Sequence, residues 1–593
     1  MSKKESIQRI YCGKVSQSEL TKKIKLYGWV NTRRDHGGVI FIDLRDVTGI
    51  CQLVFDSNLD KQLHNIANEV RTEFCLEVIG TIRNRTLDTI NAKIPTGKFE
   101  LVVEDITILN KSETLPFGLE AVALASEKTR LTYRYLDLRR PELQKNLILR
   151  SKVNQVVRNF LSAHNFHEIE TPFLNKSTPE GARDYLVPSR LAKGDFYALP
   201  QSPQMFKQLL MVAGFDRYFQ ITKCFRDEDL RGNRQPEFTQ IDLEMSFLNE
   251  DEIIDLTEKL MSSIFQAAKG IKLETPFNRI TYQQAVENYG TDAPDLRFDL
   301  LLTDITDLVK EVEFKVFKDV TLKDTGLVNC ILVPNGSDKL SRKDLDELTE
   351  FVKIYKAKGL AWAKVGEEDW HSPIAKFIAP NIKQAINKKA KAQPKDILLF
   401  VADDVKIVKA SLGALRTVLA KKLDLINNDE FNFCWVTDFP LLEYDADEKR
   451  WQSVHHPFTK PHLSDLKKYK TADLSKIKSH AYDLTLNGVE LGGGSLRIHD
   501  KKMQQEIFDI IGISDREAND KFSFLLNALE FGAPPHGGIA LGLDRLLMSL
   551  TNANSIRDVI AFPKTQQAAC LMSGAPNPAD QKQIVELGLK FTK

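Results

Sequence analysis

The sequence predicts a multidomain α/β protein that has an N-terminal β-barrel of the OB type and a mixed core interrupted by an inserted α+β domain. Three observations support this fold class. Short strand-like segments fill the first 110 residues, and helices and strands alternate to about residue 280. From there to about 425 the helices become rich in lysine, and a strand-rich pattern then resumes. A chain of 593 residues is also too long for one typical domain.

The first 110 residues contain five strand-like segments with one helical stretch between the third and the fourth, which is the pattern of an OB-type barrel. A sandwich of different topology is the alternative. On the second strand, Phe41 shares a face with Asp43 and Arg45, close to Arg33 and Arg34. Such a ring beside guanidinium groups can stack a single-stranded base, although Phe41 could equally lie at the edge of the core.

Composition indicates a soluble globular protein, with 42% hydrophobic and 27% charged residues and a net charge of +1. The overall charge therefore gives no sign of nucleic-acid binding, although the first fifty residues hold ten lysines and arginines against five acids. Seven scattered cysteines without a C-x-x-C pair favour reduced thiols and a cytoplasmic location. No segment has the length and hydrophobicity of a membrane span or the pattern of a signal peptide.

These patterns predict five regions. They are a barrel (1–110), a linker (111–143), the first part of the core (144–280), the insert (281–425) and the second part of the core with a C-terminal extension (426–593).

Three arginine-bearing segments in the core are candidates for binding a phosphorylated ligand. They contain Arg226 in FRDE, Arg497 in GGGSLRI and Arg545 in GLDR. Arginine offers a planar fork that suits phosphate or carboxylate, and Asp483 and Glu490 could hold Mg²⁺ between phosphates. Because the chain lacks a P-loop signature, these segments together predict a polyphosphate substrate bound in another way. Ion pairs on an exposed hairpin are the alternative interpretation of the FRDE segment.

Several motifs resemble those of class II aminoacyl-tRNA synthetases, specifically the bacterial aspartyl-tRNA synthetases. The matching segments are QSPQMFKQ, FRDEDLRGNRQPEFTQID, HHPFT, ELGGGSLRIHD and GGIALGLDR, together with a helix and strand that meet Pro172. The resemblance spans nearly the whole chain. It implies an antiparallel-sheet catalytic core and a GAD-like insert that opens at GTDAPDLRF, residues 290–298. Ala540 stands where the general class pattern has glycine, as it does in aspartyl enzymes.

This resemblance implies that the substrates are ATP and L-aspartate, with Mg²⁺ as cofactor. It assigns the catalytic role to Arg226 and Arg545, and metal binding to Asp483 and Glu490. The residues implied to bind ATP are Arg226, Asp227, Glu228, Gln235, Glu490, Gly542, Leu543, Asp544 and Arg545. Those implied to bind aspartate are Glu180, Ser202, Gln204, Lys207, Arg226, Asp242, His455, His456 and Arg497. Taken alone, Lys207 would be a solvated helix lysine, and the two histidines would be surface residues.

The resemblance also implies a homodimer, formed through the helix at residues 144–166 and the strand before Pro172. It places Arg34, Phe41 and Gln52 where the barrel reads the anticodon of tRNA-Asp. His36 lies in the adjacent loop, where histidine accompanies acceptance of tRNA-Asn as well, so a relaxed enzyme is expected. The alternatives are an asparagine or lysine enzyme of the same subclass, and a non-catalytic protein that binds nucleic acid through its OB-type barrel.

Overall fold

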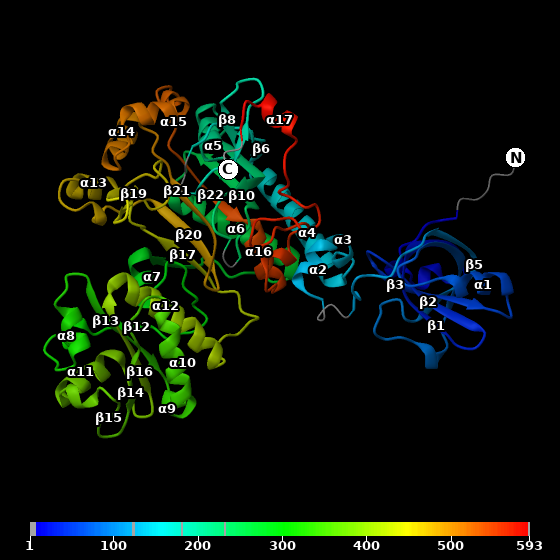
Figure 1. Ribbon diagram of the computed structural model, residues 1–593, viewed down its shortest axis with the longest axis horizontal. Helices are drawn as coiled ribbons and strands as arrows, with labels where there is room; N and C mark the ends of the chain where they lie inside the picture. The colour runs from blue at the N-terminus through cyan, green and yellow to red at the C-terminus, as the bar shows by residue number, and fades with distance from the viewer. Residues whose placement is uncertain (1–6, 121–124, 179–181, 231–232, 591–593) are drawn as a thin grey trace. The chain divides into compact units, whose positions relative to one another are not determined.

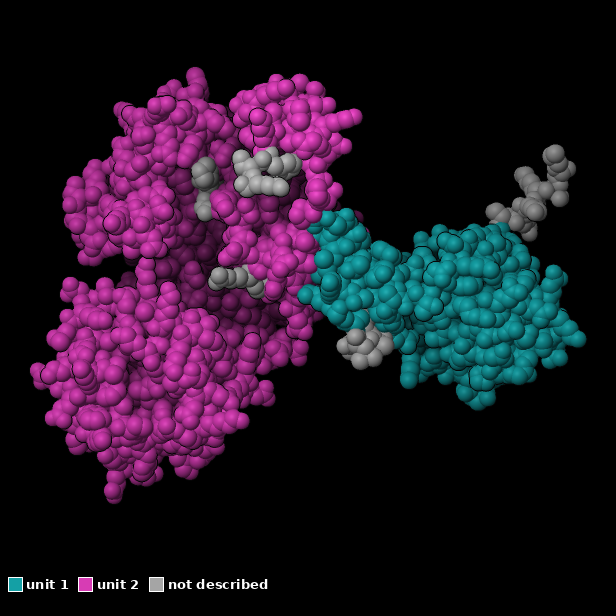
Figure 2. All heavy atoms as spheres, in the orientation of Figure 1, with its two compact units in different colours: residues 1–145, 570–575 teal, residues 146–569, 576–593 magenta. Residues whose placement is uncertain are grey.

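The computed structural model describes residues 7–120, 125–178, 182–230 and 233–590. The chain divides into two compact units, which Figure 2 colours separately. The first unit comprises residues 1–145 and 570–575, and the second comprises residues 146–569 and 576–593. Among the described residues, no helix is both long enough and apolar enough to cross a membrane.

A closed five-stranded barrel with the strand order β1-β2-β3-β5-β4 forms most of the first unit (Figure 1). Antiparallel pairs make up the barrel except where β3 and β5 close it in parallel. One helix connects β3 to β4, and Asp60 caps its first turn by accepting bonds from Gln62 N and Leu63 N. The elements are β1 (Lys23–Asp35), β2 (Val39–Asp46), β3 (Gly49–Asp56), α1 (Lys61–Glu69), β4 (Cys75–Asn84) and β5 (Phe99–Asn110).

Alternation along β2 decides which side chains fill the barrel. Ile40, Ile42 and Leu44 are fully buried, whereas Phe41 lies on the opposite face and is partly exposed. The predicted core face of this strand is therefore confirmed. Two short helices follow the barrel in the first unit, α2 (Glu127–Thr132) and α3 (Arg134–Asp137).

An eight-stranded sheet organises the second unit, with the order β11-β17-β20-β21-β22-β10-β9-β6. Its six central strands are antiparallel to one another, and the two edge strands, β11 and β6, pair in parallel with β17 and β9. The strands are β6 (His167–Glu168), β9 (Arg217–Phe225), β10 (Glu237–Ser246), β11 (Asn278–Thr281), β17 (Phe433–Thr437), β20 (Ala481–Leu486), β21 (Val489–Leu496) and β22 (His536–Gly542). Together with the barrel, this sheet confirms the predicted fold class.

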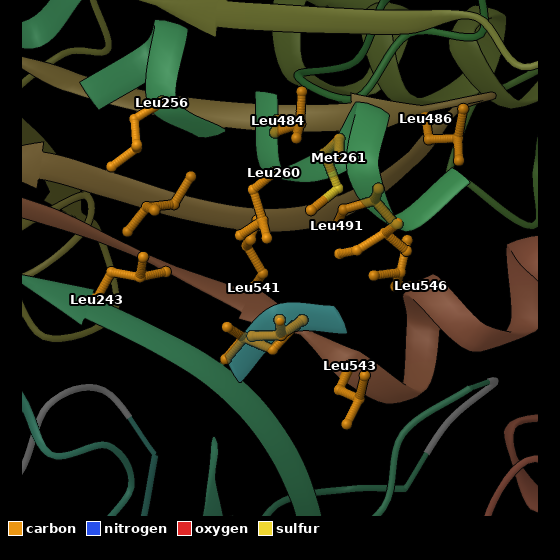
Figure 3. Packing of buried hydrophobic residues seen from close by; sticks show 14 of the residues in the cluster. Leu243, Leu256, Leu260, Met261, Leu484, Leu486, Leu491, Leu541, Leu543 and Leu546 are labelled. Carbon is orange, nitrogen blue, oxygen red and sulfur yellow. The ribbon is translucent and has the colours of Figure 1, made fainter. Parts of the chain in front are cut away.

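One face of this sheet packs against helices and forms the largest hydrophobic core. Figure 3 shows Leu243 of β10 and Leu541 of β22 in one layer with Leu260 of α6 (Glu250–Lys269) and Leu546 of α16 (Leu543–Thr551). Because successive strand residues point to opposite faces, Asp242 and Glu244 are directed to the other side of the sheet. That side carries the candidate site.

The insert contains a separate sheet with the order β12-β13-β16-β14-β15 and a hydrophobic core on each of its two faces. Buried Arg416 of α12 anchors the segment that leads into it, by donating to the carbonyls of Phe298, Asp299 and Leu300. The elements are β12 (Leu302–Asp304), α8 (Lys315–Thr321), β13 (Gly326–Val333), α9 (Gly336–Lys339), α10 (Arg342–Lys353), β14 (Ala361–Val365), β15 (Trp370–His371), α11 (Pro380–Ala390), β16 (Ile397–Asp404) and α12 (Val405–Lys422).

The remaining elements surround the large sheet. They are α4 (Pro141–Ala163), β7 (Leu186–Pro188), β8 (Phe196–Ala198), α5 (Gln204–Val212), α7 (Tyr282–Tyr289), β18 (Leu442–Asp445), β19 (Arg450–Ser453), α13 (Leu463–Tyr469), α14 (Lys501–Ile510), α15 (Asp515–Ala528) and α17 (Gln581–Glu586).

Candidate active site

A cavity of about 340 Å³ lies on the face of the large sheet that is opposite the hydrophobic core. Its walls come from α5, β10, β21, β22 and the start of α16, together with the HHPFT loop. Most of the residues that the sequence analysis proposed for substrate or metal binding line it. They are Ser202, Gln204, Lys207, Arg226, Glu228, Gln235, Asp242, His455, His456, Asp483, Glu490, Arg497, Gly542, Asp544 and Arg545.

Two of the proposed residues do not line this cavity. The Leu543 side chain is fully buried in the hydrophobic core, so only its backbone could meet a ligand. Asp227 lies 3.8 Å from Arg183 Nε, and its backbone N–H donates to the carbonyl of Arg183. A third, Glu180, lies outside the described residues.

Four buried charges alternate in sign at one end of the cavity. Lys207 Nζ lies 2.7 Å from Asp242 Oδ1 and 3.3 Å from Glu244 Oε2. Arg497 in turn donates to both oxygens of Glu244, at 2.9 and 3.1 Å. Since Lys207 is only 1% exposed, the alternative that it is a solvated helix lysine is wrong. The cluster holds two cations and two carboxylates within hydrogen-bonding reach of one another.

Glu244 was missed by the sequence analysis. It is fully buried and joins Lys207 to Arg497, yet no proposed role was assigned to it. The available signal was the strand period: Glu244 stands two residues after Asp242 and therefore shares its face. Burial acts to raise the pKa of Glu244, but Arg497 and Lys207 outweigh this effect and hold that pKa below its ordinary value.

Burial also keeps the two adjacent histidines neutral. It lowers the pKa of His455 to about 4, with a further contribution from Arg497, and it lowers the pKa of His456 well below its ordinary value. Arg497 NH1 lies 2.7 Å from His456 Nε2, and the His455 ring meets Phe439 edge to face at 4.7 Å. Both histidines are partly buried and line the cavity, so the alternative interpretation of this pair as surface residues is wrong.

Arginines and glutamates line the other end of the cavity. The guanidinium of Arg226 lies over the Phe238 ring, 5.1 Å from its centroid, on the hairpin of β9 and β10. Arg545 NH1 donates to the carbonyl of Glu490 at 2.9 Å and approaches its carboxylate at 3.4 Å. Glu228 pairs with Arg234 at 3.1 Å.

Gln235 and Asp544 line the cavity and use their side chains to bind backbone groups of other segments. The Gln235 amide accepts from Lys564 N at 2.7 Å and donates to Lys564 O at 3.0 Å, which fixes the hairpin against the chain after α16. Asp544 accepts from Thr239 N at 2.8 Å and from Arg150 at 2.5 Å. Both side chains therefore position the hairpin that carries Arg226.

Asp483 and Glu490 offer carboxylate oxygens to a cation. Asp483 Oδ1 is buried without a hydrogen-bond partner, and a Cβ on Gly493 would come within 2.2 Å of it. Burial, then Glu490 and then Asp292, raise the pKa of Asp483 well above its ordinary value. These observations fit a hard divalent cation that keeps part of its water shell, since the described residues include no group of three or more ligands.

The outward face of the barrel carries a polar network across its strands. Arg34 donates to Asp43 at 2.9 Å and to Gln52 at 3.1 Å, and Gln52 donates to Glu100 at 2.9 Å. The rings of His36 and Phe41 meet edge to face at 5.7 Å. The structure thus brings Arg34, Phe41, Gln52 and His36 to one face, with Phe41 partly open to solvent.

Comparison with known families agrees with the description of the barrel and of the large sheet with its cavity. The family of class II tRNA synthetases (D, K and N) matches residues 126–566, and the OB-fold nucleic-acid-binding domain matches residues 24–109. The chain therefore belongs to the class II aminoacyl-tRNA synthetases.

Curated relatives match along almost the whole chain. A protein of Geotalea uraniireducens named aspartate–tRNA(Asp/Asn) ligase is 54% identical and covers 98% of this chain and 97% of its own length. One of Natranaerobius thermophilus with the same name is 53% identical, with coverages of 98% and 99%. A third, from Macrococcus caseolyticus, is named aspartate–tRNA ligase and is 52% identical, with 98% of both chains covered.

Solved structures share the fold at lower identity. Asparaginyl-tRNA synthetase of Pyrococcus horikoshii complexed with asparaginyl-adenylate superposes with a TM-score of 0.60 at 19% identity, covering 94% of this chain and 98% of its own. A putative aspartyl-tRNA synthetase of Leishmania major gives 0.59 at 19% identity, with 95% of both chains covered.

Replacement of the central carboxylate tests the buried cluster. Glu244→Gln keeps the side-chain shape but leaves Lys207 and Arg497 with one carboxylate between them. We expect the free energy of unfolding of the second unit to fall by about 3–5 kcal/mol. Urea unfolding followed by tryptophan fluorescence measures this change.

Glu237→Gln is the matched control, because Glu237 lies on the same strand but its side chain is 36% exposed in its pair with Lys564. It should cost at most about 1 kcal/mol. Equal losses in the two variants would contradict the interpretation of Glu244 as the anion that the two cations share.

Proposed function

We propose that this aminoacyl-tRNA synthetase activates L-aspartate with ATP and transfers the aspartyl group to the 3′ end of tRNA. The observation that carries the proposal is the buried ion cluster in which Lys207, Asp242 and Arg497 line the cavity and Glu244 joins the two cations. Two relatives that are more than 50% identical to this chain are named aspartate–tRNA(Asp/Asn) ligases, and these names support aspartate as the substrate.

The cluster suits aspartate because its members complement the side-chain carboxylate and the ammonium group of that amino acid. Lys207 and Arg497 bind the side-chain carboxylate, and Asp242 binds the ammonium group. Asp242 Oδ2 is buried without a hydrogen-bond partner, which supports its role as the acceptor. Asparagine would leave a buried cation short of one negative charge, and a lysine side chain would add a third cation.

Activation is an in-line displacement at the α-phosphorus of ATP. An oxygen of the aspartate α-carboxylate forms a bond to that phosphorus while the bond to the bridging oxygen breaks, so that aspartyl-adenylate forms and pyrophosphate leaves. Arg226 neutralises the α-phosphate and brings it to the carboxylate, and Arg545 binds the γ-phosphate. Glu228 meets the adenine, while Gln235 and Asp544 hold the hairpin in place.

Asp483 and Glu490 would hold Mg²⁺, which the buried, unpartnered oxygen of Asp483 supports. When bound, the ion supplies positive charge to the phosphates. In the second step the terminal ribose hydroxyl of tRNA attacks the carbonyl carbon of the adenylate, an ester bond forms and AMP leaves.

ATP–pyrophosphate exchange tests the activation step and the choice of amino acid. We expect exchange with aspartate, little with asparagine or lysine, and loss of exchange when Mg²⁺ is chelated.

Arg226→Ala should abolish exchange in a folded protein, because it removes a charge that matches the transition state. Lys207→Ala should raise the KM for aspartate at least tenfold more than that for ATP.

Exchange that depends on asparagine or lysine would identify another synthetase of the subclass. Absence of exchange with all three would favour the non-catalytic alternative. Equal changes in both KM values would remove Lys207 from the amino-acid pocket.

We infer a homodimer that forms through α4 and the β6 edge of the large sheet. Apolar side chains remain exposed on α4 and just after β6, at Ile148, Phe173 and Leu174. A partner that covered them would gain the free energy of their burial. Sedimentation equilibrium at micromolar concentration should give twice the chain mass of 67.3 kDa, and a monomer there would disprove the dimer.

We infer that the barrel reads the anticodon and accepts tRNA-Asn as well as tRNA-Asp. Phe41 stacks a base, while Arg34 and Gln52 bond to phosphate and base edges. Those two anticodons differ only in the third base, and an imidazole at His36 can bond to more than one base edge. The relatives whose names include both tRNAs support this choice.

The ratio of kcat/KM for tRNA-Asp and tRNA-Asn transcripts measures this relaxed recognition. We expect the two values to agree within about tenfold, or 1.4 kcal/mol. His36→Leu should reduce aspartylation of tRNA-Asn more than that of tRNA-Asp, since an aliphatic chain leaves a polar base edge unsatisfied. His36→Gln keeps a polar side chain and should retain both activities. A thousandfold preference of the wild type for tRNA-Asp would end this inference.

A further inference from the structure

A second cavity, of about 560 Å³, adjoins the active-site cavity within the second unit. Asn233 and Arg545 line both, so the two spaces meet at the guanidinium group proposed to bind the γ-phosphate. Its other walls come from α16 and the segment after it, from the turn between β20 and β21, from Arg297 near the start of the insert and from Asn428 just after its end.

The described residues that line this second cavity include hydrogen-bond donors and no acid. Among the described residues it has two arginines, Arg297 and Arg545, and the amides of Asn233, Asn428, Asn487, Asn552 and Asn554. Guanidinium and amide N–H groups are the donors that phosphate oxygens accept. Acidic side chains would repel such an anion, and their absence from the lining favours a polyphosphate ligand.

Arg297 is held rigidly at the edge of this space. Its Nε and NH2 donate to the two oxygens of Asp295 at 2.9 and 2.7 Å, and NH1 approaches the carbonyl of Asn427 at 3.4 Å. A guanidinium group has five N–H donors, so two are left for a ligand. Its side chain is 11% exposed, and Arg416 fixes the adjacent backbone. A fixed donor loses little conformational entropy when it binds.

The active-site cavity itself contrasts with this lining. Asp242, Asp483, Glu490 and Glu228 all border it, so free pyrophosphate meets several carboxylates there. Arg545 lies between the two spaces, and an anion that moves past it reaches a wall of amides. The α16 carbonyls near Asn552 would oppose an anion, but Met548 O already accepts from Asn552 N and Ala553 N. An anion is therefore best placed towards Arg545 and Arg297.

We propose that the second cavity is a pyrophosphate-binding site through which the product of adenylate formation leaves the enzyme. This inference rests on the proposed function for the origin of the pyrophosphate. The insert contributes to the site through Arg297, which gives that domain a part in product release.

Equilibrium dialysis with radiolabelled pyrophosphate tests the site directly on the full chain, without amino acid or tRNA. It is carried out with and without saturating α,β-methylene-ATP, an analogue that occupies the nucleotide position and cannot be cleaved between its α- and β-phosphates. We expect pyrophosphate to bind alongside the analogue. The double variant Asn428→Asp/Asn554→Asp should raise the Kd measured with the analogue by about tenfold, because two carboxylates enter the lining.

Asn519→Asp/Asn527→Asp is the matched control. It adds the same two charges on exposed positions of α15, and the Kd should stay within twofold of the wild type. If the lining double variant does not fold, Asn554→Asp alone provides the test, with an expected rise of about threefold. The KM for ATP should change less than twofold in every variant.

Loss of all pyrophosphate binding in the presence of the analogue would overturn the proposal, as would a Kd unchanged by the lining variants. A raised KM for tRNA with an unchanged pyrophosphate Kd would assign the cavity to RNA and would also overturn it. If aspartate fails to support exchange while the lining variants still weaken pyrophosphate binding, the proposed function fails and the binding site stands.

Discussion

The buried ion cluster around Glu244 is the constraint on which the active site depends. Removing four charged groups from water carries a large desolvation cost, and the cost is offset only where each group keeps close, hydrogen-bonded partners of opposite charge. Lys207, Asp242, Glu244 and Arg497 meet this condition with distances between 2.7 and 3.3 Å. Since the cluster is neutral as a whole, the side-chain carboxylate and the ammonium group of aspartate together keep the balance, and its α-carboxylate is left for the phosphate end of the cavity.

The large sheet makes this arrangement possible by separating two kinds of side chain. On β10, Leu243 and Met245 pack into the core, while on the opposite face Asp242 lines the cavity and Glu244 is buried against Lys207 and Arg497. Two strands away, β21 contributes Gly492, Gly493 and Gly494, where a Cβ would approach Ala540 O, Asp483 Oδ1 and Gly538 O within 2.2 Å. The glycine run thus keeps the strands and the carboxylate of Asp483 at their observed spacing. With larger residues at these three glycine positions, the strands could not approach as closely.

Much of the fold follows from local sequence patterns, whereas the site does not. Alternation along β2 predicted its buried face correctly, because one strand needs no knowledge of its neighbours. The burial of Lys207 depends on Asp242 and Glu244 of β10, more than thirty residues further along the chain, so its helix alone suggested a solvated residue. Only the family motifs indicated its role. The contact of Gln235 could not be predicted from local sequence either, because its partner Lys564 lies 329 residues away.

The position of the insert follows from the pairing of the two strands that flank it. β11 and β17 lie side by side in parallel, from Asn278 opposite Cys434 to Thr281 opposite Thr437. Parallel neighbours need a crossover connection, because a tight turn cannot join them. Any such connection has to leave the sheet and return to it, so a folded domain can replace a simple helix there without disturbing strand order. Its two ends must then return to the same edge, which places Arg297 and Asn428 on the wall of one cavity beside Arg545.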